Sequence, residues 1–281
     1  MRRYVKIFAW IGSRIGKPAG FERVVRFFVP LEKCGDLPEV CLVRDGSLIV
    51  TRLGHPLGWH LAFFGSYEPE LREIVRTVLP SGGVAIDIGA NVGWHTLLMA
   101  RLVGAEGRVL AIEANPSVRE HLERNVKFNR LGQVEVVPFA IAESERHLDF
   151  HGPNADDPAS ASGHVSGRTE EKTGLIRVKA RSLDSIVEER RIARVDLIKI
   201  DVEGFEWPAL QGGEETITRF RPYIVFEYDS AYARRGGGST SVLAEFLQMH
   251  RYRLFAIGRN WAEALDGSAW SHCGNILAAP L

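Results

Sequence analysis

Residues 84–96, VAIDIGANVGWHT, carry the strongest structural signal in this chain of 281 residues. The run VAIDI is typical of a buried strand, because it is short, apolar and followed by turn residues. Gly89 stands in the turn, and Gly93 precedes the apolar helical pattern WHTLLMARLV. Glycine allows positive φ and a close approach of ligand to backbone, and parallel sheets bind ligands at the carboxyl ends of their strands. The stretch therefore predicts a cofactor loop.

The spacing of the glycines indicates which kind of cofactor. A dinucleotide fingerprint needs G-x-G-x-x-G, but Asn91 occupies the place of the second glycine, which leaves the spacing G-x-x-x-G. Glu113 closes the next predicted strand, 24 residues after Gly89. An acidic side chain at that place accepts hydrogen bonds from ribose hydroxyls. The combination predicts a nucleoside site without a diphosphate seat, for which S-adenosylmethionine is a common ligand.

Strand and helix patterns alternate on both sides of this loop, which predicts an α/β fold with a parallel, doubly wound sheet. Residues 151–174 are rich in Gly, Ser, Ala, Asp and Pro and form the most loop-like insertion. The predicted strands are 84–88, 108–113, 134–141, 195–200, 223–228, 252–257 and 275–280, and the predicted helices are 94–103, 116–129, 205–220 and 241–250.

The first 66 residues have a different texture and predict an N-terminal helical and β extension before a main domain at 67–281. Residues 1–30 place apolar side chains at helical spacing among basic ones. We favour a helix that docks on the main domain or a subunit; peripheral membrane contact and disorder are the alternatives. Residues 38–66 predict a small β cap with a turn at Asp45 and Gly46, and Pro69 opens a predicted helix over 70–79.

Composition excludes several classes of protein. The 35 Lys+Arg balance the 35 Asp+Glu, so no overall charge attracts nucleic acid, and we expect none as a partner. Cys34, Cys41 and Cys273 are few and scattered, which predicts reduced thiols and a cytoplasmic protein. Arg14 and Lys17 interrupt the apolar N-terminal stretch too early for a signal peptide.

Further motifs resemble the FkbM-type S-adenosylmethionine-dependent methyltransferases. They match in order and spacing over about residues 67–229. Ala114 and Asn115 separate Glu113 from Pro116, whereas many members of the family place proline directly after the acid. The motifs are YEPEL (67–71), IDIGANVGWHTLLMA (86–100), GRVLAIEANP (107–116), the run NVKFN that ends at Asn129, DLIKIDVEGFEWPALQGG (196–213) and PYIVFEY (222–228).

The resemblance implies a Rossmann-like class I methyltransferase sheet of seven strands, with the seventh antiparallel, and methyl transfer usually to oxygen. It also implies residues that contact the cofactor. Gly89, Asn91 and Gly93 would line its methionine and ribose end, Glu113 would hold the ribose, and Ala140 would lie near adenine. Asp87 would meet the cofactor's amino group directly or through water, and Tyr67 and Glu68 would lie at the cofactor mouth.

Acceptor chemistry should gather at the same sheet edge. Asp201 follows one predicted strand, and Glu227 and Asp229 stand at the end of the next. These carboxylates offer a base or, in an alternative interpretation, ligands for Mg²⁺ or another divalent cation. His95 is a further candidate base. We predict Asp201, His95 and Glu227 as catalytic residues.

Two neighbours of these candidates carry predictions of their own. Lys199 lies inside an apolar strand, where an unpaired charge is costly. We therefore expect Lys199 to reach Asp87, Glu227 or the cofactor. Glu203, which precedes Gly204 and the run FEWPAL, is a candidate helix cap.

The leading functional hypothesis is O-methylation of a hydroxyl on a small molecule or sugar, of polyketide, glycan or glycolipid type. Methylation of a carboxylate or of nitrogen is the nearest alternative. A third hypothesis is a nucleoside-binding scaffold without turnover, held at a membrane or in a glycosyltransferase complex. The sequence leaves the identity of the acceptor and the formation of a homo-oligomer open.

Overall fold

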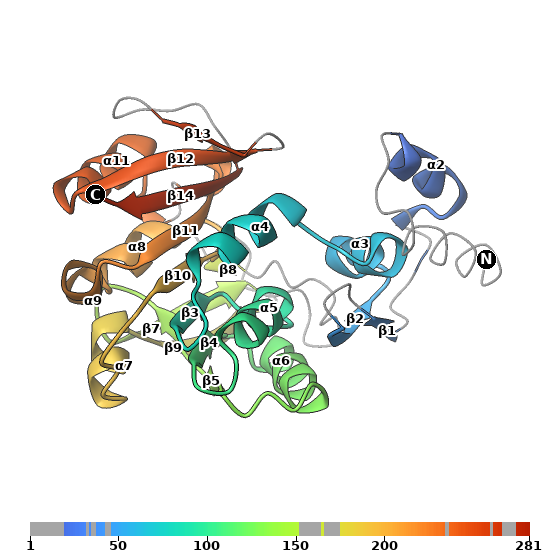
Figure 1. The fold of residues 1–281 in the computed structure, drawn as a ribbon, viewed down its shortest axis with the longest axis horizontal. Coiled ribbons are helices and arrows are strands. Elements are labelled where there is room, and N and C mark those ends of the chain that lie inside the picture. The colour runs from blue at the N-terminus through green and yellow to red at the C-terminus, as the bar shows by residue number, and fades with distance from the viewer. Residues whose placement is uncertain are drawn as a thin grey trace.

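The computed structural model describes residues 20–31, 34, 38–42, 46–151, 164–165, 175–233, 236–258, 261–265 and 274–281. A central sheet organises them, with the strand order β13-β12-β14-β11-β10-β3-β4-β5 (Figure 1). Its strands are β3 (Val84–Ile88), β4 (Arg108–Ile112), β5 (Val134–Val137), β10 (Leu197–Ile200), β11 (Tyr223–Tyr228), β12 (Tyr252–Gly258), β13 (Trp261–Ala264) and β14 (Gly274–Pro280).

The direction of the strands agrees with the doubly wound class I sheet. β11, β10, β3, β4 and β5 run parallel to their neighbours in that series. β14 inserts antiparallel between β11 and β12. The predicted fold class is therefore confirmed, and β13 adds an eighth strand by pairing antiparallel with β12 at the edge.

Alternate residues of the central strands face opposite layers, because successive side chains of a strand point to opposite faces. Ile86 packs in the core that contains residues of α7 (Leu183–Glu189), α8 (Glu206–Gln211), α9 (Glu214–Phe220) and α11 (Thr240–Met249). Ala85 packs in the other core, with α4 (Pro69–Val78), α5 (Trp94–Val103) and α6 (Pro116–Phe128). Both faces of the sheet are thus covered, which explains why its strands are apolar throughout.

Two predicted elements are broken in the structure. The predicted strand 134–141 ends at Val137 in the main sheet, because Pro138 has no N–H to continue the ladder. The predicted helix 205–220 divides into α8 and α9 at Gly212, where a Cβ would lie 2.1 Å from the carbonyl oxygen of Ala142. The turn between the two helices therefore packs closely against the segment that contains Ala142, which leaves no room for a side chain at position 212.

A second, smaller sheet was not predicted. It has the strand order β6-β9-β7-β8, so strands that precede the predicted loop-like insertion pair with a strand that follows it. Of the insertion itself, only residues 151 and 164–165 are described. Its strands are β6 (Ala140–Ile141), β7 (Arg146–His151), β8 (His164–Val165) and β9 (Leu175–Arg181).

The N-terminal extension contains the predicted hairpin, formed by β1 (Pro38–Leu42) and β2 (Leu48–Arg52). The following stretch is helical instead of β: α3 spans Pro56–Phe64, with Pro56 in its first turn and the His55 side chain accepting from Leu57 N at 3.3 Å. Its Trp59 packs with Val25 of α2 (Phe21–Phe28). Of the helix predicted within residues 1–30, the part up to residue 19 lies outside the described residues.

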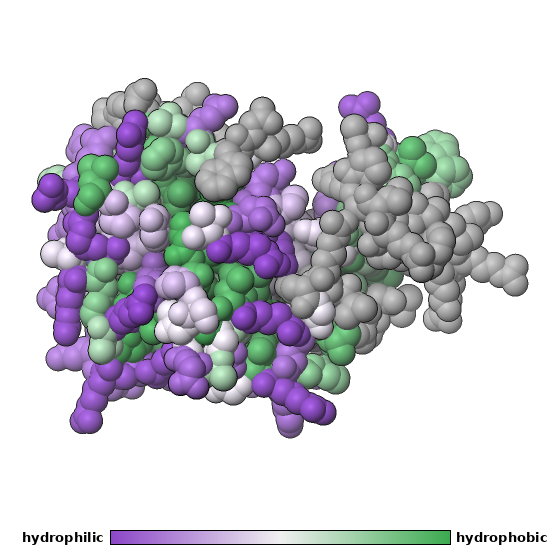
Figure 2. All heavy atoms as spheres, viewed as in Figure 1, coloured by the Kyte–Doolittle hydropathy of each residue, from purple (hydrophilic) through white to green (hydrophobic). Residues whose placement is uncertain are grey.

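The N-terminal extension exposes apolar side chains to solvent. α2 exposes Val24, Phe27 and Phe28, which contribute to the hydrophobic colour at that end of the molecule (Figure 2). Among the helices formed by the described residues, none has the length and apolarity needed to cross a bilayer.

Asn125 of α6 and Asn129 at the C-cap of this helix attach the hairpin to the helical layer of the main sheet. The Asn125 amide oxygen accepts from Val50 N at 2.8 Å, and its nitrogen donates to the carbonyls of Val50 at 3.1 Å and Val92 at 2.8 Å. Asn129 pairs in the same manner with both backbone groups of Leu48. One side chain, Asn125, thus holds both the hairpin and the turn that contains Val92.

Candidate active site

A pocket of about 230 Å³ lies at the carboxyl ends of β3, β4, β10 and β11. Most of the residues predicted from the sequence line it, whereas Asp87, Gly93 and Asp229 do not. The predicted residues that line it are Tyr67, Glu68, Gly89, Asn91, His95, Glu113, Ala140, Asp201 and Glu227.

The glycine turn brings two strand ends together. Gly89 has a φ of +75°, and a Cβ on it would lie 1.9 Å from the carbonyl oxygen of Asp201. Gly93 has a φ of +95°, and Asn91 also adopts positive φ, at 52°. Only glycine allows the turn after β3 to approach the backbone after β10 this closely.

Glu113 holds this turn from the end of β4. One carboxylate oxygen accepts from Asn91 N at 3.0 Å and the other from Asn115 N at 2.8 Å. Burial raises the pKa of Glu113 to about 7, although both hydrogen bonds favour the charged form. Each carboxylate oxygen has more than one acceptor direction, so Glu113 retains capacity for a ligand's hydroxyl groups.

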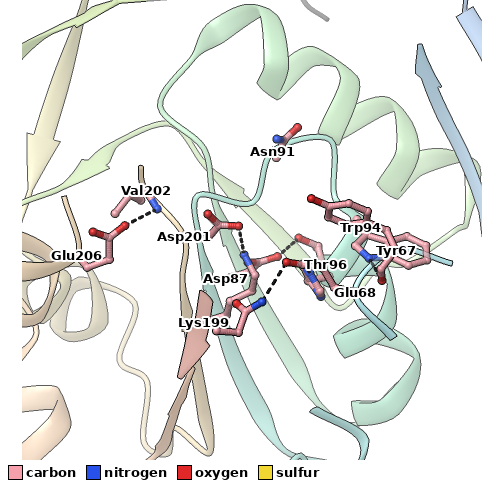
Figure 3. Close-up of polar contacts among 12 residues, drawn as sticks. Tyr67, Glu68, Asp87, Asn91, Trp94, Thr96, Lys199, Asp201, Val202 and Glu206 are labelled. Carbon is pink, nitrogen blue, oxygen red and sulfur yellow. Dashed lines mark hydrogen bonds and ion pairs between the residues drawn. The ribbon is translucent and has the colours of Figure 1, made fainter. Parts of the chain in front are cut away.

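A buried cation, Lys199, is among the residues that line the pocket (Figure 3). The Lys199 ammonium donates to Asp201 Oδ2 at 3.0 Å and lies 3.7 Å from Asp87 Oδ1. Burial alone would lower the pKa of Lys199, but the charges of Asp201 and Asp87 outweigh it and raise this pKa. Thr96 donates to the other Asp87 oxygen at 2.6 Å. The expectation that Lys199 reaches Asp87 is confirmed, and Asp87 serves here to neutralise Lys199.

Asp201 and Glu227 form a hydrogen-bonded carboxyl pair at the pocket wall. Burial and the charge of Asp201 raise the pKa of Glu227 to about 9. Burial also opposes ionisation of Asp201, but Lys199 and the hydrogen bond with Glu227 hold the pKa of Asp201 below its usual range. At neutral pH the pair therefore has one proton, carried by Glu227.

His95 faces the pocket from the first turn of α5. Its Nε2 lies 2.9 Å from Glu68 Oε2, and Asn275 of β14 donates to Glu68 Oε1 at 3.0 Å. Burial opposes ionisation of Glu68, yet the hydrogen bond with His95 holds the pKa of Glu68 below its usual range. Sequence reasoning missed Asn275, because nothing in the local pattern of a C-terminal strand points to a partner 207 positions earlier in the chain.

The predicted metal set of Asp201, Glu227 and Asp229 finds no support in this arrangement. Asp229 lies off the pocket lining, and one oxygen of Asp201 is engaged by Lys199. Within the described ranges, no three His, Cys, Asp or Glu side chains gather in a way that would hold a metal ion.

The loop after Asp201 is held by a residue that the sequence did not single out. The Glu206 carboxylate accepts from Gly204 N at 3.0 Å and from Val202 N at 3.3 Å. Glu203, which was predicted as the cap, instead lines the pocket with a φ of 52°. The acid in the first turn of α8 was the signal that could have identified Glu206.

Comparison with known proteins gives related sequences. The chain is 28% identical over 168 residues to the 2-O-methyltransferase NoeI of Sinorhizobium fredii, covering 56% of this chain and 68% of that protein. It is 27% identical over 194 residues to the hexuronic acid methyltransferase AglP of Haloferax volcanii, covering 67% and 76%. It also matches the AMB antimetabolite synthetase AmbE of Pseudomonas aeruginosa, at 26% identity over 236 residues, with 67% of this chain but only 11% of AmbE covered.

A family model describes the larger part of the chain. The Methyltransferase FkbM domain matches residues 87–254, from Asp87 in the strand before the glycine turn to Leu254 in β12. The matched range includes Glu113, Asp201 and Glu227, whose positions at the sheet edge are described above. The chain therefore belongs to the FkbM family of S-adenosylmethionine-dependent methyltransferases.

Proposed function

We propose that this methyltransferase acts on a hydroxyl oxygen of an uncharged, sugar-like small molecule. The observation that supports this proposal is the charge of the pocket wall. Most of the ionisable side chains that line the pocket are acidic: Glu68, Glu113, Asp201, Glu203 and Glu227. The described lining residues include no arginine, and the ammonium of Lys199 is already engaged by Asp87 and Asp201.

This charge distribution disfavours an anionic acceptor. A carboxylate placed beside Asp201 would meet like charge without an available cation to neutralise it, which is unfavourable in a partly buried site. An uncharged hydroxyl meets no such penalty and finds hydrogen-bond partners instead. The name of NoeI, a 2-O-methyltransferase, supports transfer to oxygen. The name of AglP, a hexuronic acid methyltransferase, supports a sugar-type acceptor. It does not support the absence of charge, which rests on the pocket wall alone.

The residues present fit S-adenosylmethionine. Glu113 offers acceptor oxygens of the kind that ribose hydroxyls use, and Gly89 and Asn91 of the positive-φ turn line the same pocket, where a ligand can approach them closely. Phe139 and Ala140 give the same pocket an apolar wall suited to a purine base. When bound, this cofactor supplies a methyl group on a positively charged sulfur.

The carboxyl pair suits the orientation of an acceptor. The proton that Glu227 carries is donated to Asp201, so the remaining lone pairs of both carboxyl groups are acceptors for a ligand. A sugar hydroxyl can donate to such an acceptor, which would fix its orientation at the pocket wall. Positioning of this kind is the main requirement for an in-line group transfer.

The test uses labelled S-adenosylmethionine and three matched acceptors: p-nitrophenyl glucoside, glucuronide and glucosaminide. We expect methylated product from the glucoside, with mass spectrometry and NMR placing the methyl group on a hydroxyl oxygen. Methyl ester formation on the glucuronide, or N-methylation of the glucosaminide alone, would refute the proposal in favour of the alternative acceptors. Tight binding of the cofactor without turnover of any acceptor in a wider panel would support the scaffold hypothesis.

A further inference from the structure

His95 has one ring nitrogen engaged and one available. The side chain lines the pocket and is 6% exposed. Nε2 lies 2.9 Å from Glu68 Oε2. Nδ1 is buried and has no hydrogen-bond partner within the described part of the chain. An unpartnered buried nitrogen is costly, and because the side chain lines the pocket, this atom points to an interaction made when the pocket is filled.

Glu68 is itself held in a costly conformation. Its φ of 46° places a non-glycine residue in the left-handed region directly before Pro69. This turn directs one carboxylate oxygen to His95 and the other to Asn275, at 2.9 and 3.0 Å. Asn275 lies opposite Glu227 in the pairing of β11 with β14. Residues from three distant segments thus meet in one hydrogen-bonded chain.

The chain fixes which nitrogen carries the proton. Glu68 is ionised at neutral pH, because His95 holds its pKa below the usual range, and a carboxylate only accepts hydrogen bonds. Nε2 must therefore donate. In the neutral imidazole the lone pair then lies on Nδ1, the atom without a partner.

The other candidate bases are poorly matched to proton removal. Asp201 is stabilised as an anion by Lys199, which makes it a weak base. Glu227 already carries a proton at neutral pH. A base works best when its affinity for a proton suits the working pH, and the imidazole is the side chain that ordinarily does so.

We propose that His95 Nδ1 accepts the proton of the acceptor hydroxyl, and that Glu68 and Asn275 are positioning residues for His95. This inference rests on the proposed hydroxyl acceptor. The acceptor oxygen bonds to the methyl carbon as the carbon–sulfur bond breaks, and the electron pair of that bond returns to sulfur. The hydroxyl proton passes to Nδ1, and the resulting positive charge is stabilised by Glu68 through Nε2–H.

The first experiment needs no acceptor. ¹⁵N NMR of histidine-labelled protein, with His95 assigned among the nine histidines through His95→Gln, should show a neutral ring protonated at Nε2. Glu68→Gln removes the ionised acceptor of Nε2–H, so the ¹⁵N shifts of His95 should change towards a mixture of the Nδ1–H and Nε2–H forms. The other ionisable residues that line the pocket are unchanged in this variant: His55, Tyr67, Glu113, Lys199, Asp201, Glu203 and Glu227. Glu73→Gln, an exposed acid in α4, is the matched control and should leave the ¹⁵N shifts of His95 unchanged.

The second experiment measures turnover of the accepted glycoside. His95→Gln should lower kcat about a hundredfold, and Glu68→Gln about tenfold. Asn275→Ala should lower kcat several-fold without removing the charge. Calorimetry should give cofactor affinities within about twofold of wild type for all variants, which also shows that they fold.

Different failures have different meanings. A ring protonated at Nδ1, unchanged ¹⁵N shifts of His95 in Glu68→Gln, or wild-type kcat in His95→Gln would overturn the inference. Loss of cofactor affinity in Glu68→Gln would return Glu68 to the cofactor-contacting role predicted from the sequence, and would also overturn it. Failure of wild-type protein to methylate any hydroxyl refutes the proposed function instead, and the NMR result still decides the arrangement of His95, Glu68 and Asn275.

Discussion

Single side chains at this sheet edge both stabilise the local backbone and line the pocket. Glu113 accepts one backbone N–H on each carboxylate oxygen, so it stabilises the turn as well as offering acceptors to a ligand. Asp201 likewise neutralises Lys199 and hydrogen-bonds with Glu227. A substitution at such a position is expected to change ligand binding, catalysis and stability to different degrees. Each of these three effects can be measured separately.

Glu113→Ala should weaken binding of S-adenosylmethionine about tenfold to a hundredfold, because hydrogen bonds to a charged group contribute about 1.5–3 kcal/mol. Calorimetry of wild type and variant measures the change. Glu106→Ala, an exposed acid in the loop after α5, is the control and should bind normally. Equal affinity in both variants would show that Glu113 does not hold the ribose.

Asp201→Asn should lower kcat/KM for the acceptor about tenfold to a hundredfold while keeping cofactor affinity within about twofold, because the lost charge-assisted hydrogen bonds lie on the acceptor side of the pocket. Steady-state kinetics and calorimetry separate the two effects. Asp149→Asn, on an exposed part of β7, serves as control. Unchanged turnover would remove Asp201 from the site.

Glu227→Gln should flatten the dependence of stability on pH. The folded-state pKa of Glu227 is raised to about 9, so folding takes up a proton between the unfolded value of 4.5 and this pH. The stability contribution is fully present below pH 4.5 and is lost as the pH rises towards 9. Glutamine mimics the protonated form, so the Tm of the variant relative to wild type should be higher at pH 9 than at pH 5. A constant difference would contradict the raised pKa.

At the scale of elements, the site exists because the turn after β3 meets the loop after β10. Gly89 allows the contact, since a Cβ would lie 1.9 Å from Asp201 O. Glu206 holds the second loop by accepting from Val202 and Gly204. The two loops are therefore fixed relative to each other before any ligand binds.

Gly89→Ala should destabilise the fold and weaken cofactor binding. Gly82→Ala is a matched control, because both glycines have positive φ, +75° and +71°, but nothing lies within 4 Å of a Cβ at Gly82. The difference in unfolding free energy should be about 1–3 kcal/mol in urea titrations. Equal costs would mean that φ strain alone, and not the contact with Asp201, requires glycine.

Sequence patterns predicted the elements whose signals are local. The strand at 84–88 and the helix at 94–103 have the predicted bounds, because burial on both faces demands continuous apolar runs. The approach of Asp201 and Glu227 also followed, since parallel strands end at one edge. The helical α3 was missed because its run PLGWHLAFF is apolar throughout and shows no helical periodicity. Asn275 was missed because its partner Glu68 belongs to a distant segment.

At the scale of the whole molecule, the N-terminal extension is joined to the family domain by polar contacts as well as apolar ones. Asn125 is fully buried and bonds both Val50 of β2 and Val92 of the cofactor turn. The division at residue 66 stays a prediction, but the bonds of Asn125 couple the hairpin to the site.

Asn125→Ala should cost about 2–3 kcal/mol of unfolding free energy, at about 1 kcal/mol for each lost hydrogen bond, and should increase proteolytic cleavage near the hairpin. Asn129→Ala, which removes contacts to Leu48 in a more exposed place, should cost about 1 kcal/mol. Urea titration measures both. A smaller cost for Asn125→Ala than for Asn129→Ala would show that the hairpin is held mainly by its apolar contacts.

The bridging amide of Asn125 also limits how this enzyme can be shortened. A version trimmed to start at residue 67 would retain every strand of the central sheet, yet it would remove Val50, to which Asn125 makes two of its three backbone bonds. The remaining bond supports Val92, two residues from the start of α5. Minimal catalytic fragments for biotechnology should therefore keep the hairpin, even where acceptor choice is redesigned.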